Sequence, residues 1–196
     1  MNIILFDTEY FSLSKKKSSI QNIKKYQNLL FPEIMHLGAY KYSNFFFKKK
    51  PRKINIFFKT KQKIPERIKN LTGINEKILK NKGKDFNKNI YSFLNLIDKK
   101  PIIFSNGNDL EIIKLNMKYN NLNEVNKIVT FVNLRKVIGN IDTEKRYLKY
   151  SYTKLKLHNA LNDCFILKLS IDDFIKTYGR DVFIKIVNKK KKLIKL

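Results

Sequence analysis

The feature that most constrains the fold is an apolar run that ends in two acidic residues. In NIILFDTEY, residues 3–6 are all apolar, as expected of a strand that is buried on both faces. Asp7 and Glu9 follow at alternate positions, so both carboxylates of an extended strand would point to the same side. Like charges this close repel each other, and burial raises the cost. The folded chain must therefore supply something that neutralises them.

Length and composition predict one globular domain. The chain has 196 residues, of which 43% are hydrophobic and 13% aromatic, enough to bury a core. Cys164 is the one cysteine, which excludes an internal disulfide and is compatible with a reducing compartment. The sequence shows neither a signal peptide nor an apolar stretch of membrane-spanning length. We expect an intracellular, cytoplasmic protein with one domain over residues 1–188 and a solvated, Lys-rich tail over 189–196.

The charge is strongly basic, with 42 Lys and Arg against 16 Asp and Glu and a formal net charge of +26. A partner with a phosphate backbone is one explanation, because cationic side chains displace condensed counterions. A membrane surface would attract the same charge, and codon drift in an AT-rich genome would also produce it. Charge alone does not decide between these alternatives. The scarcity of acidic residues does make a pair of them on an apolar strand more notable.

The order of the predicted elements indicates the fold class. Three strands come first, and helices then alternate with strands, which predicts an α/β domain with a mixed sheet whose early strands form an antiparallel meander. The expected elements are strands over 3–6, 34–42 and 52–60, a helix between Pro65 and Gly73, a helix over 86–97, a strand over 101–106, a helix from Asp109, a strand over 127–134 and a helix over 160–175. Residues 11–32 are expected to form a basic loop with one short helix, and residues 45–51 a turn.

Three further residues suited to chemistry lie in suggestive places. Asp109 follows an apolar strand, and Asp163 lies on the strongest predicted helix, five residues after His158. Each also has an ordinary explanation. Asp109 could be a helix N-cap, Asp163 a solvated surface residue and His158 a loop or core histidine, and a lone D-x-E occurs by chance in many proteins. Their combination carries more weight than any one of them.

Together these motifs resemble the DEDD 3′→5′ exonucleases of the ribonuclease-H-like superfamily. The resemblance covers residues 4–174 and rests on FDTEY, PEIMHLGAY, IPERIKNLTGIN, SNGNDLEII and LHNALNDC, which stand in the order of the family's motifs. Asp7 and Glu9 match the first motif and Asp109 the second. His158 and Asp163 match the third, H-x-x-x-x-D, which marks the histidine (DEDDh) subtype. Within the family the chain is most similar to the short RNA- and DNA-trimming members, of the proofreading and RNase T-like kind.

The sequence departs from the family pattern at three places. The basic segment between Tyr10 and Phe31 is long where many members pass directly to the second strand. Asn133 stands where members often carry an acidic residue. Asn162 and Cys164 replace an acidic and a small residue of the third motif.

The resemblance implies a ribonuclease-H-like mixed sheet flanked by helices, with two Mg²⁺ or Mn²⁺ ions as cofactors. Two such ions, about 3.5–4 Å apart, would balance four converging carboxylates, and hard oxygen ligands suit them. By resemblance, Asp7 would bind both ions, Glu9 and Asp163 one of them, and Asp109 would act partly through water. His158 would be the general base. The implied activity is removal of nucleoside 5′-monophosphates from the 3′ ends of single-stranded RNA or DNA.

Substrate contacts are predicted at two places. The backbone N–H groups around Thr8 would hold the terminal nucleotide, and Tyr10 or Phe11 would stack on a base. In the LTGI segment, Leu71 and Thr72 match the place where family members wedge between the last two bases. Core packing is the alternative for Phe11 and Leu71.

Several alternatives stay open from the sequence. The protein could be a catalytically silent nucleic-acid-binding module with the same fold, although all five site residues are present. A preference for RNA or DNA depends on detail of the pocket, and the oligomeric state and any protein partner are equally open. We expect no membrane partner. His36, on the second strand, is interpreted as structural because nothing nearby in the sequence supplies a partner.

Overall fold

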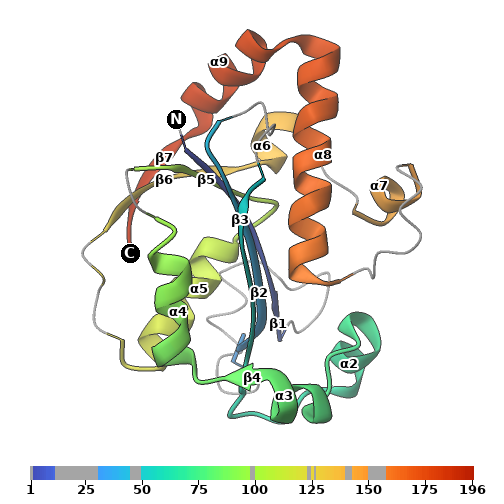
Figure 1. Ribbon diagram of the computed structural model, residues 1–196, viewed down its shortest axis with the longest axis vertical. Helices are drawn as coiled ribbons and strands as arrows, with labels where there is room; N and C mark the ends of the chain where they lie inside the picture. The colour runs from blue at the N-terminus through green and yellow to red at the C-terminus, as the bar shows by residue number, and fades with distance from the viewer. Residues whose placement is uncertain are drawn as a thin grey trace.

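The computed structural model describes residues 2–11, 31–44, 50–97, 100–122, 125, 127–139, 143–149 and 158–196. Within this part of the chain, the strands form a seven-stranded sheet in the order β4-β3-β2-β1-β5-β6-β7 (Figure 1). The strands are β1 (Ile3–Tyr10), β2 (Ile34–Tyr42), β3 (Arg52–Phe58), β4 (Gly83–Lys84), β5 (Ile102–Ser105), β6 (Ile128–Asn133) and β7 (Lys192–Lys195).

The sheet is mixed, and β1 lies at its centre. Strands β1, β2 and β3 form an antiparallel meander, in which Asp7 lies opposite Gly38. On its other side β1 pairs in parallel with β5, and β5 pairs in parallel with β6. The outer strands β4 and β7 pair with β3 in parallel and with β6 antiparallel, respectively. This arrangement confirms the predicted α/β fold, with its early meander followed by alternating helices and strands.

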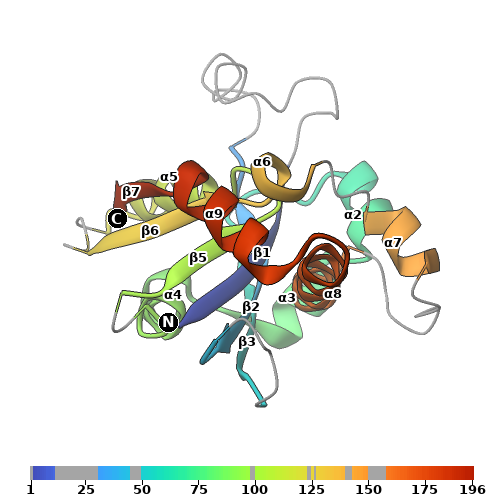
Figure 2. The same ribbon diagram turned by 90° about the horizontal axis from the view of Figure 1, so that it is seen from above.

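Helices cover both faces of the sheet (Figures 1 and 2). α4 (Phe86–Leu94) and α5 (Asp109–Tyr119) pack on one face, and α8 (Ala160–Tyr178) and α9 (Arg180–Lys190) pack on the other. The remaining described helices are short: α2 (Glu66–Thr72), α3 (Glu76–Lys82), α6 (Arg135–Ile138) and α7 (Thr143–Lys149). None of the helices in the described ranges has an apolar stretch long enough to cross a membrane.

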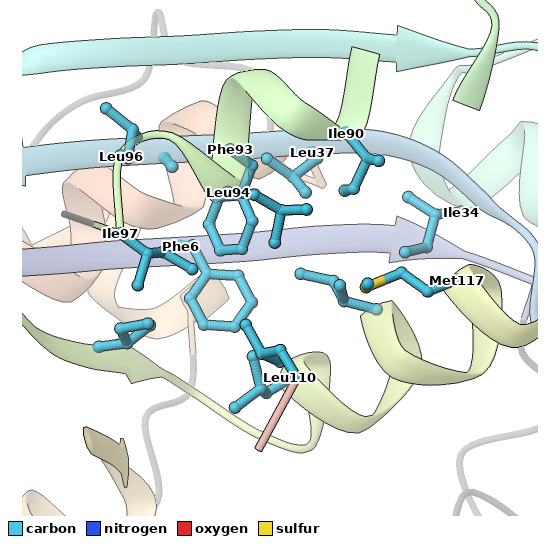
Figure 3. Close-up of a cluster of buried hydrophobic side chains, with 14 of the residues drawn as sticks. Phe6, Ile34, Leu37, Ile90, Phe93, Leu94, Leu96, Ile97, Leu110 and Met117 are labelled. Atoms are coloured by element: carbon cyan, nitrogen blue, oxygen red, sulfur yellow. The ribbon is translucent and has the colours of Figure 1, made fainter. Parts of the chain in front are cut away.

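The apolar run of β1 supplies side chains to both cores. Ile4 and Phe6 pack against α4 and α5, and Phe6 lies 5.2 Å from Phe93 between ring centroids (Figure 3). Ile3 and Leu5 point to the opposite face, into the cluster that α8 and α9 cover. All four β1 side chains are fully buried, as predicted for a strand with two covered faces. Both cores therefore hold β1 in place up to the residue where Asp7 begins the polar segment.

The predicted helix boundaries agree with the structure where the sequence carries strong local signals. α2 begins directly after Pro65 and ends at Gly73, whose φ of 66° is the left-handed conformation that glycine adopts easily. α5 begins at Asp109 as expected. The short helices α3, α6 and α7, and also α9, were not predicted. In α9 only Phe183 and Val187 are buried, so the apolar stripe that could have predicted this helix is narrow.

The Lys-rich C-terminal segment differs from the solvated tail that we expected over residues 189–196. Lys189 and Lys190 complete α9, and Lys192–Lys195 form β7 against β6. The backbone N–H of Leu196 then donates to the oxygen of Lys127 over 2.9 Å, and the Leu196 side chain is buried. The backbone of this segment is thus hydrogen-bonded to β6, a partner that the local sequence pattern does not predict.

Two predicted segments fall mainly outside the described residues. They are the basic loop with its short helix, of which residues 12–30 lie outside, and the turn over 45–51, of which residues 45–49 lie outside.

Candidate active site

The structure brings all five predicted site residues to one pocket. Asp7 and Glu9 come from the end of β1, Asp109 from the start of α5, and His158 and Asp163 from the start of α8. The pocket has a volume of about 200 Å³ and lies where β1 and β5 end. Segments that are up to 156 positions apart in the sequence, from Asp7 to Asp163, therefore share one small cavity.

Parallel pairing of β1 and β5 explains half of this convergence. Leu5 lies beside Phe104, so the carboxyl ends of both strands reach the same edge of the sheet. Asp109 follows β5 after a short turn in which Ser105 Oγ donates to the oxygen of Gly107 over 3.2 Å. Asp109 therefore begins its helix at the edge where Asp7 and Glu9 project.

A close approach of α8 to β2 explains the other half. A Cβ atom on Gly38 would lie only 2.3 Å from the backbone nitrogen of Leu161, so only glycine allows this contact. Cys164, one helical turn further, donates from its Sγ to the oxygen of Gly38 over 3.1 Å. Because Gly38 lies opposite Asp7 in the sheet, the contact brings the first turn of α8 over the end of β1. Asp163 lies in that first turn.

Three of the five side chains form a compact group. Glu9, His158 and Asp163 each offer one oxygen or nitrogen atom, and these atoms all lie within 4.8 Å of one another. His158 has a φ of 52°, the left-handed region that non-glycine residues adopt uncommonly. It immediately precedes Asn159, whose side chain accepts from the backbone N–H of Asn162 over 3.2 Å and caps α8. The turn that begins the helix thus also orients the imidazole.

Burial and mutual repulsion raise the pKa of the pocket carboxyls. The pKa of Asp7 lies well above its ordinary value because burial disfavours the charged form, and the neighbouring carboxylates raise it further. Arg135 opposes this shift. The pKa of Glu9 is also raised well above its ordinary value, first by burial and then by the charge of Asp163 and a hydrogen bond to it. Without a bound cation, the pocket carboxyls therefore resist carrying their full negative charge.

The donor set suits a hard divalent cation. Carboxylate oxygens are the hard ligands that Mg²⁺ and Mn²⁺ take in proteins. The chain's one thiol, Cys164, is buried and directed at Gly38, and burial raises its pKa well above the ordinary value. A cation held by Glu9 and Asp163, beside His158, would offset the repulsion that raises the pKa of the carboxyls. The residues present therefore fit the divalent ions that the sequence predicts.

Asp109 does not cap its helix, the role that would be ordinary for an Asp at this position. The N-cap residue is Asn108, and no side-chain bond caps the helix. Asp109 Oδ1 instead accepts from the Thr8 backbone N–H over 3.2 Å and from the Thr8 hydroxyl over 2.8 Å. Burial raises the pKa of Asp109, and these hydrogen bonds oppose the shift. Asp109 thus ties the start of α5 to the end of β1.

The same bonds change the interpretation of Thr8. Its amide, which we expected to hold the terminal nucleotide, donates to Asp109, so a nucleotide would compete with that carboxylate. Tyr10 is half-buried and lines the pocket. Leu71 is 44% exposed on α2, as a residue that wedges between bases must be.

Two of the predicted nucleic-acid contacts are buried in this fold. Phe11 is 1% exposed and packs in a small core with Met35 and Ile64, which is the alternative that the sequence left open. Thr72 is buried, and its hydroxyl donates to the oxygen of Ile68 over 2.8 Å. Both side chains are therefore covered by the rest of the fold and are not exposed to a base.

His36 is structural, as expected, but it has partners that sequence reasoning missed. Its Nε2 contacts Oδ1 of Asn55 on β3, and its ring stacks on Phe57 at 4.1 Å between centroids. Its Nδ1 accepts from the backbone N–H of Ala160 over 3.3 Å, so Nε2 carries the proton. Burial lowers the pKa of His36 to about 4, which keeps the ring neutral. His36 thereby holds the first residue of α8, two positions after His158.

Arg135 also lines the pocket and was not predicted. It follows β6, the next parallel strand after β5, and its backbone N–H donates to Oδ1 of Asn133 over 3.0 Å. The signal that could have found it is its position, since the carboxyl ends of parallel strands share one edge. Asn108, on the turn before α5, is a second pocket residue that was missed.

The whole fold is similar to solved exonuclease structures. The cell-death related nuclease CRN-4 aligns with a TM-score of 0.66 and 12% identity, over 100% of this chain and 80% of that one. The nuclease domain of 3′hExo, a DEDDh family member bound to rAMP, aligns with a TM-score of 0.63 and 12% identity, over 91% and 93% of the two chains. This chain has the fold of the DEDDh exonucleases. The predicted resemblance is thus confirmed at the level of the fold.

One of the similar structures is a complex with DNA. Exonuclease X, solved with 5′ overhanging duplex DNA, aligns with a TM-score of 0.58 and 14% identity, over 94% of this chain and 99% of that one. No family model matches the chain, and no curated protein matches it in sequence. Identities this low establish the fold, so the activity has to be argued from the pocket itself.

Proposed function

We propose that the protein is a metal-dependent 3′→5′ exonuclease of the DEDDh type, which removes nucleoside 5′-monophosphates from the ends of single-stranded RNA or DNA. The observation that carries the proposal is the group formed by Glu9, His158 and Asp163, with ligand atoms within 4.8 Å of one another. Asp7 and Asp109 line the same pocket, on the fold that DEDDh exonucleases share. A pocket of this composition suits hydrolysis of a phosphodiester more than simple binding, because acidic side chains alone repel a polyanion.

Asp7, Glu9, Asp109 and Asp163 are the residues that would hold two Mg²⁺ or Mn²⁺ ions. When bound, such ions would lower the pKa of the attacking water and place positive charge near the departing 3′-oxygen. The raised pKa of Asp7 and of Glu9 supports this assignment, since both carboxyls gain most from a nearby cation. Asp109 has a hydrogen-bonded partner in Thr8, which fits a more indirect role.

His158 would act as the general base. A neutral imidazole takes the proton of the attacking water on an unprotonated ring nitrogen. The carboxylates of Glu9 and Asp163 lie beside the ring, so they stabilise the imidazolium that forms. Arg135, which also lines the pocket, would attract the phosphate of the substrate.

The experiment is digestion of 5′-labelled single-stranded RNA and DNA of the same sequence, with Mn²⁺ or with EDTA. We expect stepwise shortening from the 3′ end that EDTA abolishes. Asp7→Asn should also abolish it, because the variant keeps the size of the side chain and loses its charge. Asp172→Asn is the matched control, since Asp172 lies on α8, pairs with Lys168 and is not among the residues that line the pocket.

The outcomes separate the proposal from its alternative. Binding of the oligonucleotide without shortening, under any divalent metal, would favour the catalytically silent module and overturn the proposal. Shortening from the 5′ end would overturn the assigned polarity. The two substrates compared in one assay also give the preference between RNA and DNA, which depends on recognition of the 2′-OH.

A further inference from the structure

Two further hollows continue from the pocket along the edge of the sheet. The first has a volume of about 200 Å³ and shares Asn108 with the pocket. It lies between the start of α5 and the strands β6 and β7, and Lys136, Lys190 and Lys192 line it. The second is larger, about 720 Å³, and shares Glu111 with the first. Through these shared residues the pocket and the two hollows adjoin one another in order, and we call the two outer hollows together the α5–β7 groove.

The groove leads away from the pocket. α5 begins at the pocket with Asp109 and runs to Tyr119, beside β7 (Figure 2). β7 is antiparallel to β6, so Lys192 lies beside Phe131 near the pocket end, whereas Lys195 lies beside Ile128 at the far end. Both walls of the groove thus run in the same direction, over about 16 Å for the eleven residues of α5.

Lysines line the groove along its whole length. Lys136, Lys190 and Lys192 line the first hollow, and Lys114, Lys118 and Lys195 line the second. All of these side chains except that of Lys114, which is half-buried, are exposed. Glu111 is the one acidic residue among those that line either hollow. An acidic pocket is therefore continuous with a basic groove, and the positive potential of the groove favours a polyanion.

Protection of the sheet edge is the ordinary explanation for part of this pattern. β7 is the last strand of the sheet, and lysines on an edge strand discourage pairing with other chains. That explanation covers Lys192 and Lys195. It does not account for Lys114 and Lys118 on α5, which is a helix, or for Lys136 on α6. A ligand that contacts both walls accounts for all of them.

We propose that the α5–β7 groove binds the phosphate backbone of the same single strand whose 3′ end enters the pocket. The inference rests on the proposed function, because it assigns the upstream part of that substrate. Asn108 lies at the junction, so a strand that ends at the carboxylates continues directly into the groove. The lysines contact phosphates several nucleotides from the scissile bond, and such remote contacts lower KM without changing kcat.

The test measures how the loss of lysine charges affects the digestion of short and long strands. The groove variant combines Lys114→Gln, Lys118→Gln and Lys192→Gln, which removes three charges from both walls. The control variant combines Lys53→Gln, Lys88→Gln and Lys185→Gln, exposed lysines on β3, α4 and α9 that do not line the groove. Both variants have the same net charge. Substrates are single strands of about 4 and about 16 nucleotides with the same 3′ sequence, a span that reaches from the pocket alone to beyond the groove.

We expect the groove variant to raise KM for the long strand by about tenfold, with kcat and the short strand unchanged. The slope of log KM against log salt should also fall by about 2 for the long strand, since each phosphate contact on a single strand contributes about 0.7. The control variant should behave as wild type. An equal loss in both variants would show that only net charge matters, and an equal loss for both strand lengths would exclude an upstream contact. Either result overturns the proposal.

A binding assay separates this proposal from the proposed function. The long strand is titrated by fluorescence anisotropy against Asp7→Asn protein, with and without the three groove substitutions. If wild type lacks exonuclease activity but the groove substitutions still weaken binding, the groove stands and the proposed function falls. If wild type is active and the substitutions change neither KM nor binding, the groove falls alone. A poly-glutamate peptide that competes as well as the oligonucleotide would reassign the groove to acidic proteins and overturn the proposal.

Discussion

The acidic pocket and the basic α5–β7 groove meet at Asn108 and use charge in opposite ways. In the pocket, Glu9 and Asp163 are at most 8% exposed, so their charges are strongly felt by one another. In the groove most lysines are exposed, and water and salt screen them. Buried charge is costly and changes the pKa of its neighbours, whereas exposed charge is inexpensive and acts on partners in solution.

Substitutions in the two regions should therefore have different effects. Changes in the pocket should alter the chemical step and the stability of the folded chain together, because the same buried groups control both. Changes in the groove should alter affinity alone.

The largest effect is expected from His158→Ala. Loss of the general base should lower kcat by about 10²–10⁴, because only proton transfer is removed. The four carboxylates remain, so Mn²⁺ should still raise the melting temperature of the variant. Single-turnover digestion measures the first effect and thermal melts with and without Mn²⁺ the second. A variant as active as wild type would remove His158 from the chemistry.

Gly38→Ala should have the largest effect on stability. The added Cβ would lie 2.3 Å from the Leu161 nitrogen and 2.4 Å from the Ala160 carbonyl carbon, both backbone atoms that cannot rotate away. The start of α8 must therefore move away from β2, at a cost of about 3 kcal/mol in the free energy of unfolding. Activity should fall as well, since Asp163 moves with the helix.

Ala39→Gly serves as the control for that substitution. Ala39 is the next residue of β2, it is buried, and it faces the opposite core, away from α8. Losing its methyl group should cost about 1 kcal/mol and leave activity intact. Urea unfolding of both variants, with exonuclease rates measured alongside, gives the comparison. If Gly38→Ala were as stable and active as wild type, close contact between β2 and α8 would not assemble the pocket.

Glu9→Gln should stabilise the metal-free protein at neutral pH. Folding raises the pKa of Glu9, so the folded chain holds this proton to higher pH than the unfolded chain does. The contribution of Glu9 to stability is therefore greatest at low pH, and it falls as pH rises from the ordinary pKa, about 4.3, toward the raised one. Glu9→Gln has no charge to bury, so the variant avoids this loss of stability. In EDTA at pH 7 its melting temperature should be about 2–4 °C above that of wild type.

Glu66→Gln is the matched control, because it makes the same change of net charge on the exposed side of α2. Its melting temperature should stay close to that of wild type at every pH. With Mn²⁺ the order should reverse, since wild type gains binding energy that Glu9→Gln has lost. A Glu9→Gln protein that is less stable than wild type in EDTA would mean that repulsion between carboxylates does not dominate the metal-free pocket.

Much of the fold and of the pocket could be predicted from the sequence, because the strongest signals in the sequence are local. The apolar run before Asp7 identifies a doubly buried strand, and Asp109 stands at a strand-to-helix boundary. His158 and Asp163 lie within one short motif at the start of a long helix. Once the order of strands is known, the carboxyl ends of β1 and β5 must meet, which brings these residues together.

Features that depend on tertiary contacts could not be predicted. The partner of His36 is Asn55, which lies on a neighbouring strand, and no local pattern joins them. β7 has only Leu193 and Ile194 among lysines, so its pairing with β6 decides its structure rather than its own hydrophobic pattern. Phe11 was assigned to the substrate because it follows the motif, but its burial depends on helices far along the chain.

The smallest effect is expected from Lys149→Gln, outside both regions. Lys149 Nζ lies 2.6 Å from Asp173 Oδ2, yet the Lys149 side chain is 60% exposed, and Arg146 also lies 3.7 Å from that oxygen. An exposed pair of this kind contributes about 0–1 kcal/mol, and loss of one lysine relieves some repulsion in a chain with a net charge of +26. The free energy of unfolding, measured with urea, should therefore change by less than about 0.5 kcal/mol, and by less still at high salt. A larger loss of stability would show that exposed lysines do stabilise this fold. The buried charges of the pocket and the exposed charges of the groove would then differ only in the size of their effect on stability.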